Sequence, residues 1–566
     1  MSSDKTPQTA PAEAPPRGRR STASDGLSNR LERYLLTHFG LLWRLAQAIP
    51  PLERWLNKRL INRAVEKCPA RPNPLSLMAD YPSWDSLTDR SFTGRHLPPA
   101  DEAFQRRLPP LDRVLPLFER PEGGGRLSAK STVLFANFAQ WFTDGFLRTD
   151  RHDFRRNTSN YEIDLSTVYG RTRPVAFALR ARDGTGRLRS NQIPPGKRPD
   201  GKDRVGGEFP PFYFEDEFVN GRTNEARVRP EFEDTAIAHE LRLLELELAY
   251  LQRDPERMRA RFALGVERAN NQIGYVMHNV LFLREHNRLC TLLRSKHPDW
   301  DDDRLYYTAR NTVIVMLIRL VVEEYVNHIA PYHFKFRAQP HSFSASKWYR
   351  TNWMTLEFNL LYRWHGLVTD TVRLGGRTIP VEKTLFNNTL LIEEGLAVAF
   401  DSASRQKAGE ITLRNTPSFL VNTVEKASLE LARKARLRSY NDYREYASFP
   451  RVKEFNEITG DESLQRALRD VYGSPDNVEF FVGLFAEDVQ ENAAVPMMLL
   501  GRLVAVDAFS QALTNPLLSE RVFRPETFAE GWEEFMNTRC LGDVVRRNIP
   551  GEPLREPLVT MTQRRG

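Results

Sequence analysis

A mainly α-helical fold is predicted by three features of the sequence. Apolar residues recur at helical spacing through long segments such as "TAIAHELRLLELELAYLQ" and "YYTARNTVIVMLIRLVVEEYVNHIA". The alternation of apolar and polar residues that marks a half-buried strand is scarce, and no internal repeat is present. Because 566 residues are enough for a large buried core, we expect one catalytic body over residues 96–550 with an N-terminal appendage.

The N-terminal part of the chain divides into a tail and a pair of amphipathic segments. Residues 1–28 are polar and rich in Pro, Ser and Ala, so we expect a disordered tail without the apolar stretch of a secretory signal. Residues 29–95 begin with amphipathic segments that break at Pro50-Pro51. These helices either pack on the core as surface helices or lie in a membrane interface as a monotopic anchor. No segment approaches the roughly 20 apolar residues of a spanning helix.

The rest of the chain alternates between loop and helix. Residues 171–235 are rich in Gly, Pro and charge and lack periodicity, which predicts a loop-like region. Helical patterns dominate from about Thr235 to Tyr332 and continue to about Leu513. A second tail is expected over residues 551–566.

Composition limits the class of partner and the compartment. The net charge of +8, from 81 basic and 73 acidic residues, permits a membrane surface or a carboxylate substrate. No basic run is interleaved with aromatic residues, so a nucleic-acid partner is not expected. Three cysteines argue against a disulfide framework and for a reducing compartment, and we expect a peripheral membrane protein on the cytoplasmic side.

The segment "EFNLLYRWHGLVTD" (357–370) carries the first candidate chemistry. No HExxH, CxxC, Walker or GxSxG motif is present, which argues against zinc, nucleotide and hydrolase chemistry. His365 lies in an apolar stretch of helical spacing, one helical turn after Tyr362. It is either a packed core histidine or the ligand of a metal with a redox tyrosine beside it.

Three separated segments favour the metal. They are "FANFAQWFTDGFLRTD", "LFLREHNRLC" with the following "HPDWDDDRLYYTAR", and "EFNLLYRWHGLVTD". In this order they resemble the animal-type haem peroxidase superfamily, in particular its cyclooxygenase and fatty-acid dioxygenase branch. The resemblance runs from about Tyr34 to Leu513 and includes "DLSTVYG", "VEEYVNHIAPYHFKF", "FNNTLLIEEG" and "SYNDYREY". It implies a haem buried between helices.

On the proximal side, the resemblance makes His365 the axial ligand of haem b. Asn441 matches the family's asparagine that fixes the histidine tautomer, although it is equally suited to a turn. Tyr362 matches the tyrosine that cyclooxygenases oxidise to a radical, the alternative being a core tyrosine. Phe358 and Trp364 would line the pocket, as apolar core residues also would.

The resemblance also implies a channel for an unsaturated fatty acid. Arg63 matches the arginine that pairs with the substrate carboxylate, although it is also an ordinary helix arginine. Four further residues match channel positions: Tyr325, Val326, Leu503 and Ser510, with Tyr332 beside Arg63. Asp507 departs from the pattern, because a small apolar residue is expected there.

The distal side departs most from the family. Gln140 matches the distal glutamine, but Asp144 stands where a histidine is expected. Asp144 is either a substitute acid–base or a pocket residue of an enzyme with poor peroxidase activity; we favour the second. Arg268 matches the distal arginine of mammalian-type peroxidases, or is a surface arginine. Gly145 replaces the first calcium-binding aspartate, so calcium is not expected.

The sequence therefore predicts a haem-dependent dioxygenase that uses O2 and a tyrosyl radical on unsaturated fatty acids at a membrane surface. The alternatives are a haem peroxidase of small substrates and a non-catalytic haem- or lipid-binding homologue. The resemblance alone implies a homodimer.

Overall fold

The computed structural model describes residues 27–68, 91–150, 152–198, 200–215, 228–233, 254–349 and 354–563. Helices dominate these residues and strands are few and short, which confirms the predicted mainly α-helical class. The tail over residues 1–26 and the helical segment that begins at Thr235 lie outside the described residues.

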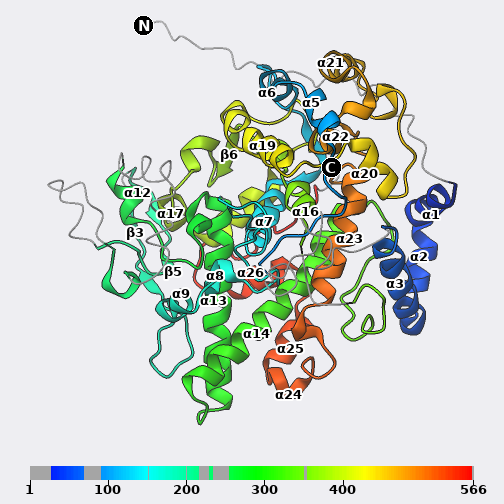
Figure 1. The fold of residues 1–566 in the computed structure, drawn as a ribbon. Helices are drawn as coiled ribbons and strands as arrows, with labels where there is room; N and C mark the ends of the chain where they lie inside the picture. Colours follow the sequence, from blue (N-terminus) through cyan, green and yellow to red (C-terminus); the bar gives the residue numbers. More distant parts are fainter. Residues whose placement is uncertain are drawn as a thin grey trace, which may run out of the picture.

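Three helices precede the body and lie together on one side of it, next to α23 (Figure 1). They are α1 (Leu27–His38), α2 (Gly40–Gln47) and α3 (Pro50–Val65). The predicted break is confirmed, because α3 begins at Pro50, where the missing N–H of proline costs no helical hydrogen bond.

Six longer helices form the frame of the body: α7 (Val133–Thr143), α13 (Ile273–Lys296), α14 (Asp302–Leu320), α17 (Thr389–Arg405), α21 (Glu462–Tyr472) and α23 (Leu499–Leu513). Shorter helical segments connect them: α5 (Glu102–Arg107), α6 (Leu111–Val114), α8 (Ser166–Tyr169), α9 (Arg173–Leu179), α12 (Pro255–Arg259), α15 (Asn327–Ile329), α16 (Leu356–Leu361), α18 (Ser418–Leu420), α19 (Lys426–Lys434), α20 (Tyr440–Tyr446), α22 (Phe480–Ala486), α24 (Pro525–Phe528), α25 (Gly531–Asn537) and α26 (Leu541–Arg547).

The strands form four antiparallel pairs. They are β1 (Leu127–Thr132) with β8 (Lys407–Gly409), β2 (Asn191–Ile193) with β5 (Gly207–Phe209), β3 (Gly196–Lys197) with β4 (Asp203–Arg204), and β6 (Thr371–Leu374) with β7 (Arg377–Pro380). Two of these pairs, together with α9, lie within residues 171–235. The expectation of a loop-like region there was therefore wrong for those residues.

Helices α13 and α14 pack side by side through the centre of the body (Figure 1). Both begin at side-chain caps: Gln272 accepts from the Gly274 N–H and Asp301 accepts from the Arg304 N–H. Most positions around α13 are buried, including His278 and Glu285, so this helix is enclosed by neighbours on all sides rather than on one face.

Helix α14 runs through a π-helical turn, η5 (Val321–Val326), into α15. Among the described residues, this continuous helix over Asp302–Ile329 is the one long and apolar enough to cross a membrane, and 78% of its apolar stretch is buried inside the molecule. Charged residues interrupt its apolar run in the sequence. Because π-helical turns occur frequently at functional sites, Tyr325 and Val326, which lie in η5, are candidate site residues.

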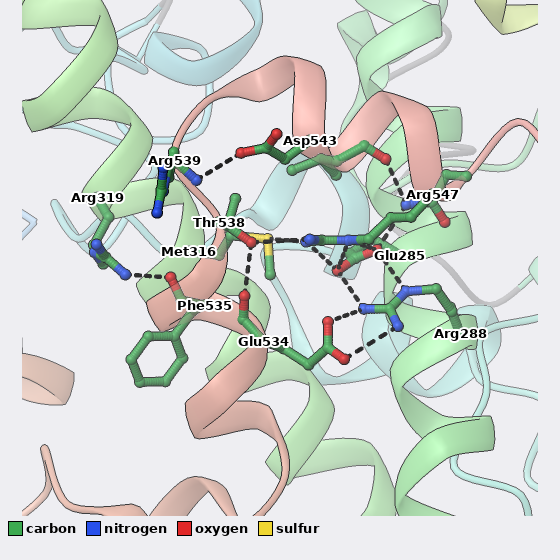
Figure 2. A network of polar contacts seen from close by, with 12 residues as sticks. Glu285, Arg288, Met316, Arg319, Glu534, Phe535, Thr538, Arg539, Asp543 and Arg547 are labelled. Atoms are coloured by element: carbon green, nitrogen blue, oxygen red, sulfur yellow. Dashed lines mark hydrogen bonds and ion pairs between the residues drawn. The ribbon is translucent and has the colours of Figure 1, made fainter. Parts of the chain in front are cut away.

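A buried ionic network joins the C-terminal helices to the centre (Figure 2). The Glu285 carboxylate on α13 accepts hydrogen bonds from Arg288 at 3.0 Å and from Arg547 of α26 at 2.7 Å. Arg288 also donates to Glu534 of α25 at 2.6 Å. Breaking one partner of such a buried network leaves an uncompensated charge, so these contacts hold α25 and α26 in place.

The C-terminal segment predicted as a tail is packed on the body. The Gln563 N–H donates to the Lys130 carbonyl at 2.7 Å, and the Thr132 N–H donates to the Met561 carbonyl at 3.0 Å. Met561 is buried. The sequence pattern missed this because a short segment that pairs with a distant strand has no periodicity of its own.

Candidate active site

Tyr362 and His365 lie at the end of α16, after the helix has stopped. The Thr355 side chain caps α16 by accepting from the Phe358 N–H at 3.0 Å. The helix ends at Leu361, and His365 opens a single 3-10 turn. The predicted continuous helix through both residues was therefore wrong. Within that turn, Gly366 passes so close to the Glu410 carbonyl that a Cβ would lie 2.6 Å from it, so this position requires glycine.

Tyr362 is enclosed by aromatic rings. It stacks on Trp364 with ring centroids 4.8 Å apart and meets the edge of Phe358 at 5.1 Å. Burial raises the pKa of Tyr362 well above its ordinary value, and interaction with the Tyr325 hydroxyl offsets this only in part. Burial likewise raises the pKa of Tyr325. Tyr362 is therefore a neutral phenol at physiological pH, and its oxidation must remove a proton together with the electron.

The proximal prediction for Asn441 was wrong. Its amide donates to the Val452 carbonyl at 2.9 Å and to Asp476 at 2.7 Å, and its oxygen accepts from the Val452 N–H, so the side chain braces a loop. The side chain that meets His365 is Glu425, whose Oε1 lies 3.0 Å from Nδ1. No sequence motif singles out Glu425, which lies in an ordinary charged helical segment.

On the distal side, Asp144 is held by a polar network. The Tyr275 hydroxyl donates to it at 2.9 Å and Arg268 donates at 3.3 Å. Arg148 lies 3.6 Å away and also pairs with Glu267. Asp144 therefore contacts two arginines and one tyrosine hydroxyl. Arg268 is one of these partners and not an isolated surface arginine.

Gln140 lies one turn before Asp144 on α7 and is exposed. The Gln272 amide donates to its oxygen at 3.0 Å. Gln140, Asp144 and Arg268, which were predicted for the distal side, therefore lie in one region. Gln272, which caps α13, contacts Gln140, and Arg268 of the neighbouring η4 turn (Glu267–Asn270) contacts Asp144.

Arg363 connects the two sides. Burial lowers the pKa of Arg363 to about 10 and Arg268 lowers it further, while Asp144 and Glu425 oppose the shift. Because one guanidinium senses both the distal Asp144 and the proximal Glu425, these carboxylates flank the same region of the interior.

Four consecutive side chains in this region carry buried polar atoms without a hydrogen-bond partner in the described part of the chain. They are Tyr362 Oη, Arg363 Nε, Trp364 Nε1 and His365 Nδ1. Buried polar atoms in native proteins are normally satisfied. The Tyr362 hydroxyl interacts with Tyr325 and His365 Nδ1 lies 3.0 Å from Glu425, so Arg363 Nε and Trp364 Nε1 are the atoms that indicate a further group. His365 keeps 18% of its side chain exposed, and Nε2 is available as a metal ligand. The residues present fit an axially bound haem.

Beneath η5, a largely apolar cavity lies between the N-terminal helices and α23. Tyr332 and Val326 line it, whereas Tyr325 is not among its lining residues. Three cationic side chains also line it: Arg33, Lys67 and Arg502. Arg63 does not. It pairs with Glu32 at 3.0 Å, is 44% exposed and lines an outer groove that meets the cavity at Lys67.

Leu503, Asp507 and Ser510 lie on the other face of α23, which packs toward α16. None of the three lines that cavity. Asp507 pairs with His96 at 3.3 Å, and both side chains are buried. Burial alone would lower the pKa of His96, but Asp507 outweighs it and the pKa is raised. The departure from an apolar residue at position 507 is thus explained by a buried ion pair, which sequence reasoning missed.

Comparisons with known proteins agree with this geometry. A family model described as animal haem peroxidase matches residues 143–512. Prostaglandin G/H synthase 2 of Equus caballus is 29% identical over 92% of this chain and 81% of its own length. Prostaglandin G/H synthase 1 of Rattus norvegicus is 27% identical over 88% of this chain and 76% of its own length.

Two solved structures share the fold. Fatty acid alpha-dioxygenase of Oryza sativa superposes with a TM-score of 0.63 at 15% identity, covering 94% of this chain and 97% of that one. Peroxidase A of Dictyostelium discoideum superposes with a TM-score of 0.59 at 16% identity, covering 88% of this chain and 97% of that one.

Proposed function

The chain belongs to the animal haem peroxidase family and is a haem-dependent oxidoreductase, and from that premise we propose that it is a dioxygenase of unsaturated fatty acids that works through a radical on Tyr362. The relatives named as prostaglandin G/H synthases and the fold neighbour named as a fatty acid alpha-dioxygenase support the substrate class. The Tyr362 phenol, packed between Phe358 and Trp364 and placed directly before the His365 turn, is the observation that carries the proposal.

His365 would hold the haem iron through Nε2, while Tyr362 and Trp364 would face the group from the same turn. A bound haem would pass on to the site the oxidising equivalent of a hydroperoxide co-substrate. The protein contributes the placement of the phenol and the exclusion of water from it. The aromatic neighbours Phe358 and Trp364 keep the phenol from bulk solvent, where a radical would be lost to side reactions.

The reaction at Tyr362 would proceed in three steps. The phenoxyl oxygen takes a hydrogen atom from an activated CH2 of the substrate, giving tyrosine and a carbon radical. Molecular oxygen adds to the carbon radical and forms a C–O bond. The resulting peroxyl radical takes the hydrogen atom back from Tyr362, which yields the lipid hydroperoxide and restores the phenoxyl radical.

The carboxylate of the substrate would be held where the outer groove and the cavity meet. Lys67 lines both, with Arg63 on the outer side and Arg502 on the inner side. Burial lowers the pKa of Lys67 and Arg502 lowers it further, while Glu32, whose carboxylate lies 3.0 Å from Nζ, opposes the shift. A substrate carboxylate would add a second anionic partner to this cluster of Lys67, Arg502 and Arg33. The acyl chain would then be buried at about 0.8 kcal/mol per CH2.

The N-terminal helices suit a membrane surface. Large apolar side chains are exposed along α1, α2 and the start of α3: Leu31, Tyr34, Leu35, Phe39, Leu41, Leu42, Leu45, Ile49, Leu52 and Trp55. Basic residues such as Arg54 and Lys58 accompany them. A contiguous apolar face with a basic border favours peripheral binding, from the cytoplasmic side as the cysteine content suggests. Co-sedimentation with anionic vesicles, lost in Leu41→Asp/Leu45→Asp, tests this part.

A haem peroxidase of small substrates is less well supported, because Asp144 is tied to Arg148, Arg268 and Tyr275 rather than available as an acid–base. A non-catalytic homologue would not need the enclosed tyrosine.

The proposal is tested by oxygen uptake of the haem-loaded protein on unsaturated fatty acids of different chain length and unsaturation. We expect uptake in the wild type and its loss in Tyr362→Phe, with the same haem content in both. Tyr349→Phe, at a more peripheral tyrosine, serves as the matched control. Absence of uptake in a wild-type protein with haem bound would reject the proposal.

A further inference from the structure

Glu425 is a buried carboxylate at the axial histidine. It ends the π-helical turn η8 (Val421–Glu425) ahead of α19, and only 2% of its side chain is exposed. Oε1 lies 3.0 Å from Nδ1 of His365 and also accepts from the Thr416 hydroxyl at 2.8 Å. Oε2 has no hydrogen-bond partner among the described residues. Apart from its contact with His365, this carboxylate accepts one hydrogen bond from the described residues, and the donor is the neutral Thr416 hydroxyl.

We propose that Glu425 is the positioning residue of His365 and gives the imidazole a partial negative charge that it passes to the iron. The inference rests on His365 as the axial ligand, not on the oxygenase reaction. Nδ1 and Oε1 are at hydrogen-bond distance although the ring N–H is not aligned with the oxygen.

The first consequence concerns the tautomer. A carboxylate can only accept at this position, so the proton of a neutral His365 is held on Nδ1 and the lone pair of Nε2 is left for a metal. The Thr416 hydroxyl keeps Oε1 in place from the other side. This is the role that the sequence assigned to Asn441, and the structure gives it to a charged group instead.

The second consequence concerns electron density. A hydrogen bond to an ionised acceptor is stronger than one to an amide, and it makes the imidazole a better donor. A more electron-rich axial ligand stabilises ferric over ferrous iron. A haem iron held at Nε2 would therefore have a lower ferric/ferrous midpoint potential than one whose axial histidine lacks a carboxylate partner.

Glu425→Gln tests the proposal because it removes the charge and keeps the shape. Glu430→Gln is the matched control, since Glu430 lies on α19 but is 54% exposed. In the haem-loaded proteins we would measure the iron–histidine stretching frequency by resonance Raman and the ferric/ferrous midpoint potential by spectroelectrochemistry. We expect a lower stretching frequency and a higher potential in Glu425→Gln, with both unchanged in Glu430→Gln.

Unchanged frequency and potential in Glu425→Gln would overturn the proposal. If that variant does not fold or load haem, Glu425→Asp keeps the charge but draws the oxygens away from Nδ1. The same two shifts, smaller in size, support the proposal there, and wild-type values overturn it. Both readouts are independent of oxygen uptake. A protein without oxygenase activity that shows these shifts would reject the proposed function and leave the role of Glu425 intact.

Discussion

Asp144 accepts a hydrogen bond from the Tyr275 hydroxyl at 2.9 Å, at the position where the family places its distal histidine. The same carboxylate meets Arg268 at 3.3 Å and Arg148 at 3.6 Å. A general base must be free to take up a proton, whereas this group is surrounded by donors. The contacts of Asp144 therefore suit a structural ionic network better than proton transfer to or from a bound peroxide.

Asp144→Asn is expected to affect stability more than turnover. Arg148 keeps Glu267 as a partner, so removing the Asp144 charge is expected to cost about 1.5–3 kcal/mol of unfolding free energy, the worth of a charge-assisted hydrogen bond. Peroxide-driven dye oxidation, which we expect to be slow in the wild type, should not fall further. Urea unfolding and a dye assay on the same preparations measure the two effects.

Asp153→Asn is the control for the Asp144 experiment, because it removes a solvent-exposed pair with Arg155 whose loss costs under about 1 kcal/mol. A large fall in dye oxidation by Asp144→Asn with unchanged stability would show that Asp144 is a working acid–base after all.

Lys67→Gln is expected to weaken the binding of free fatty acids. Loss of a charge-assisted contact costs about 1.5–3 kcal/mol, which corresponds to a rise in KM of roughly tenfold or more. The methyl ester of the same fatty acid has no carboxylate and should show the same KM with both proteins. Oxygen uptake over a range of substrate concentrations measures this.

Lys58→Gln is the matched variant for Lys67, since Lys58 lines the outer groove but not the cavity. An equal rise in KM for the acid and the ester in Lys67→Gln would place the carboxylate elsewhere.

The free energy of unfolding is expected to depend on pH through Glu487. Its carboxylate is buried and accepts from the Leu499 N–H at the start of α23. Burial raises the pKa of Glu487 to about 7, with Arg444 opposing the shift. The folded state therefore holds the proton more tightly than the unfolded state, and this group's contribution falls as pH rises from about 4.5 to about 7, by about 3 kcal/mol.

Glu487→Gln should remove that fall. The measurement is the unfolding free energy in urea at pH 5 and pH 8, compared between the variant and the wild type. The difference between the two pH values should shrink in Glu487→Gln and stay the same in Glu430→Gln. An unchanged difference in Glu487→Gln would mean that Glu487 is ionised in the folded protein.

The spatial relationships that the sequence could predict are those within one local motif. Tyr362 and Trp364 lie together as the "EFNLLYRWHG" segment indicates, and the four-residue spacing of Gln140 and Asp144 places them one turn apart at the end of α7. The helices α13 and α14 were predictable because their apolar periodicity is long.

The parts that the sequence did not predict depend on contacts between distant segments. Glu425 contacts His365 only because η8 packs against the 3-10 turn. The prediction that Asn441 contacts His365 was wrong because the Asn441 amide is hydrogen-bonded to the Val452 carbonyl instead. The position of Arg63 outside the cavity depends on how α3 is rotated against α23, which no pattern within α3 specifies. Tertiary packing decided each of these.

The most direct test of the central claim is electron paramagnetic resonance of the haem-loaded protein, frozen rapidly after addition of an organic hydroperoxide. The account predicts a tyrosyl radical signal in the wild type and in Tyr325→Phe, and its absence in Tyr362→Phe. A signal of the same shape and intensity in Tyr362→Phe would place the radical on another residue and contradict the account.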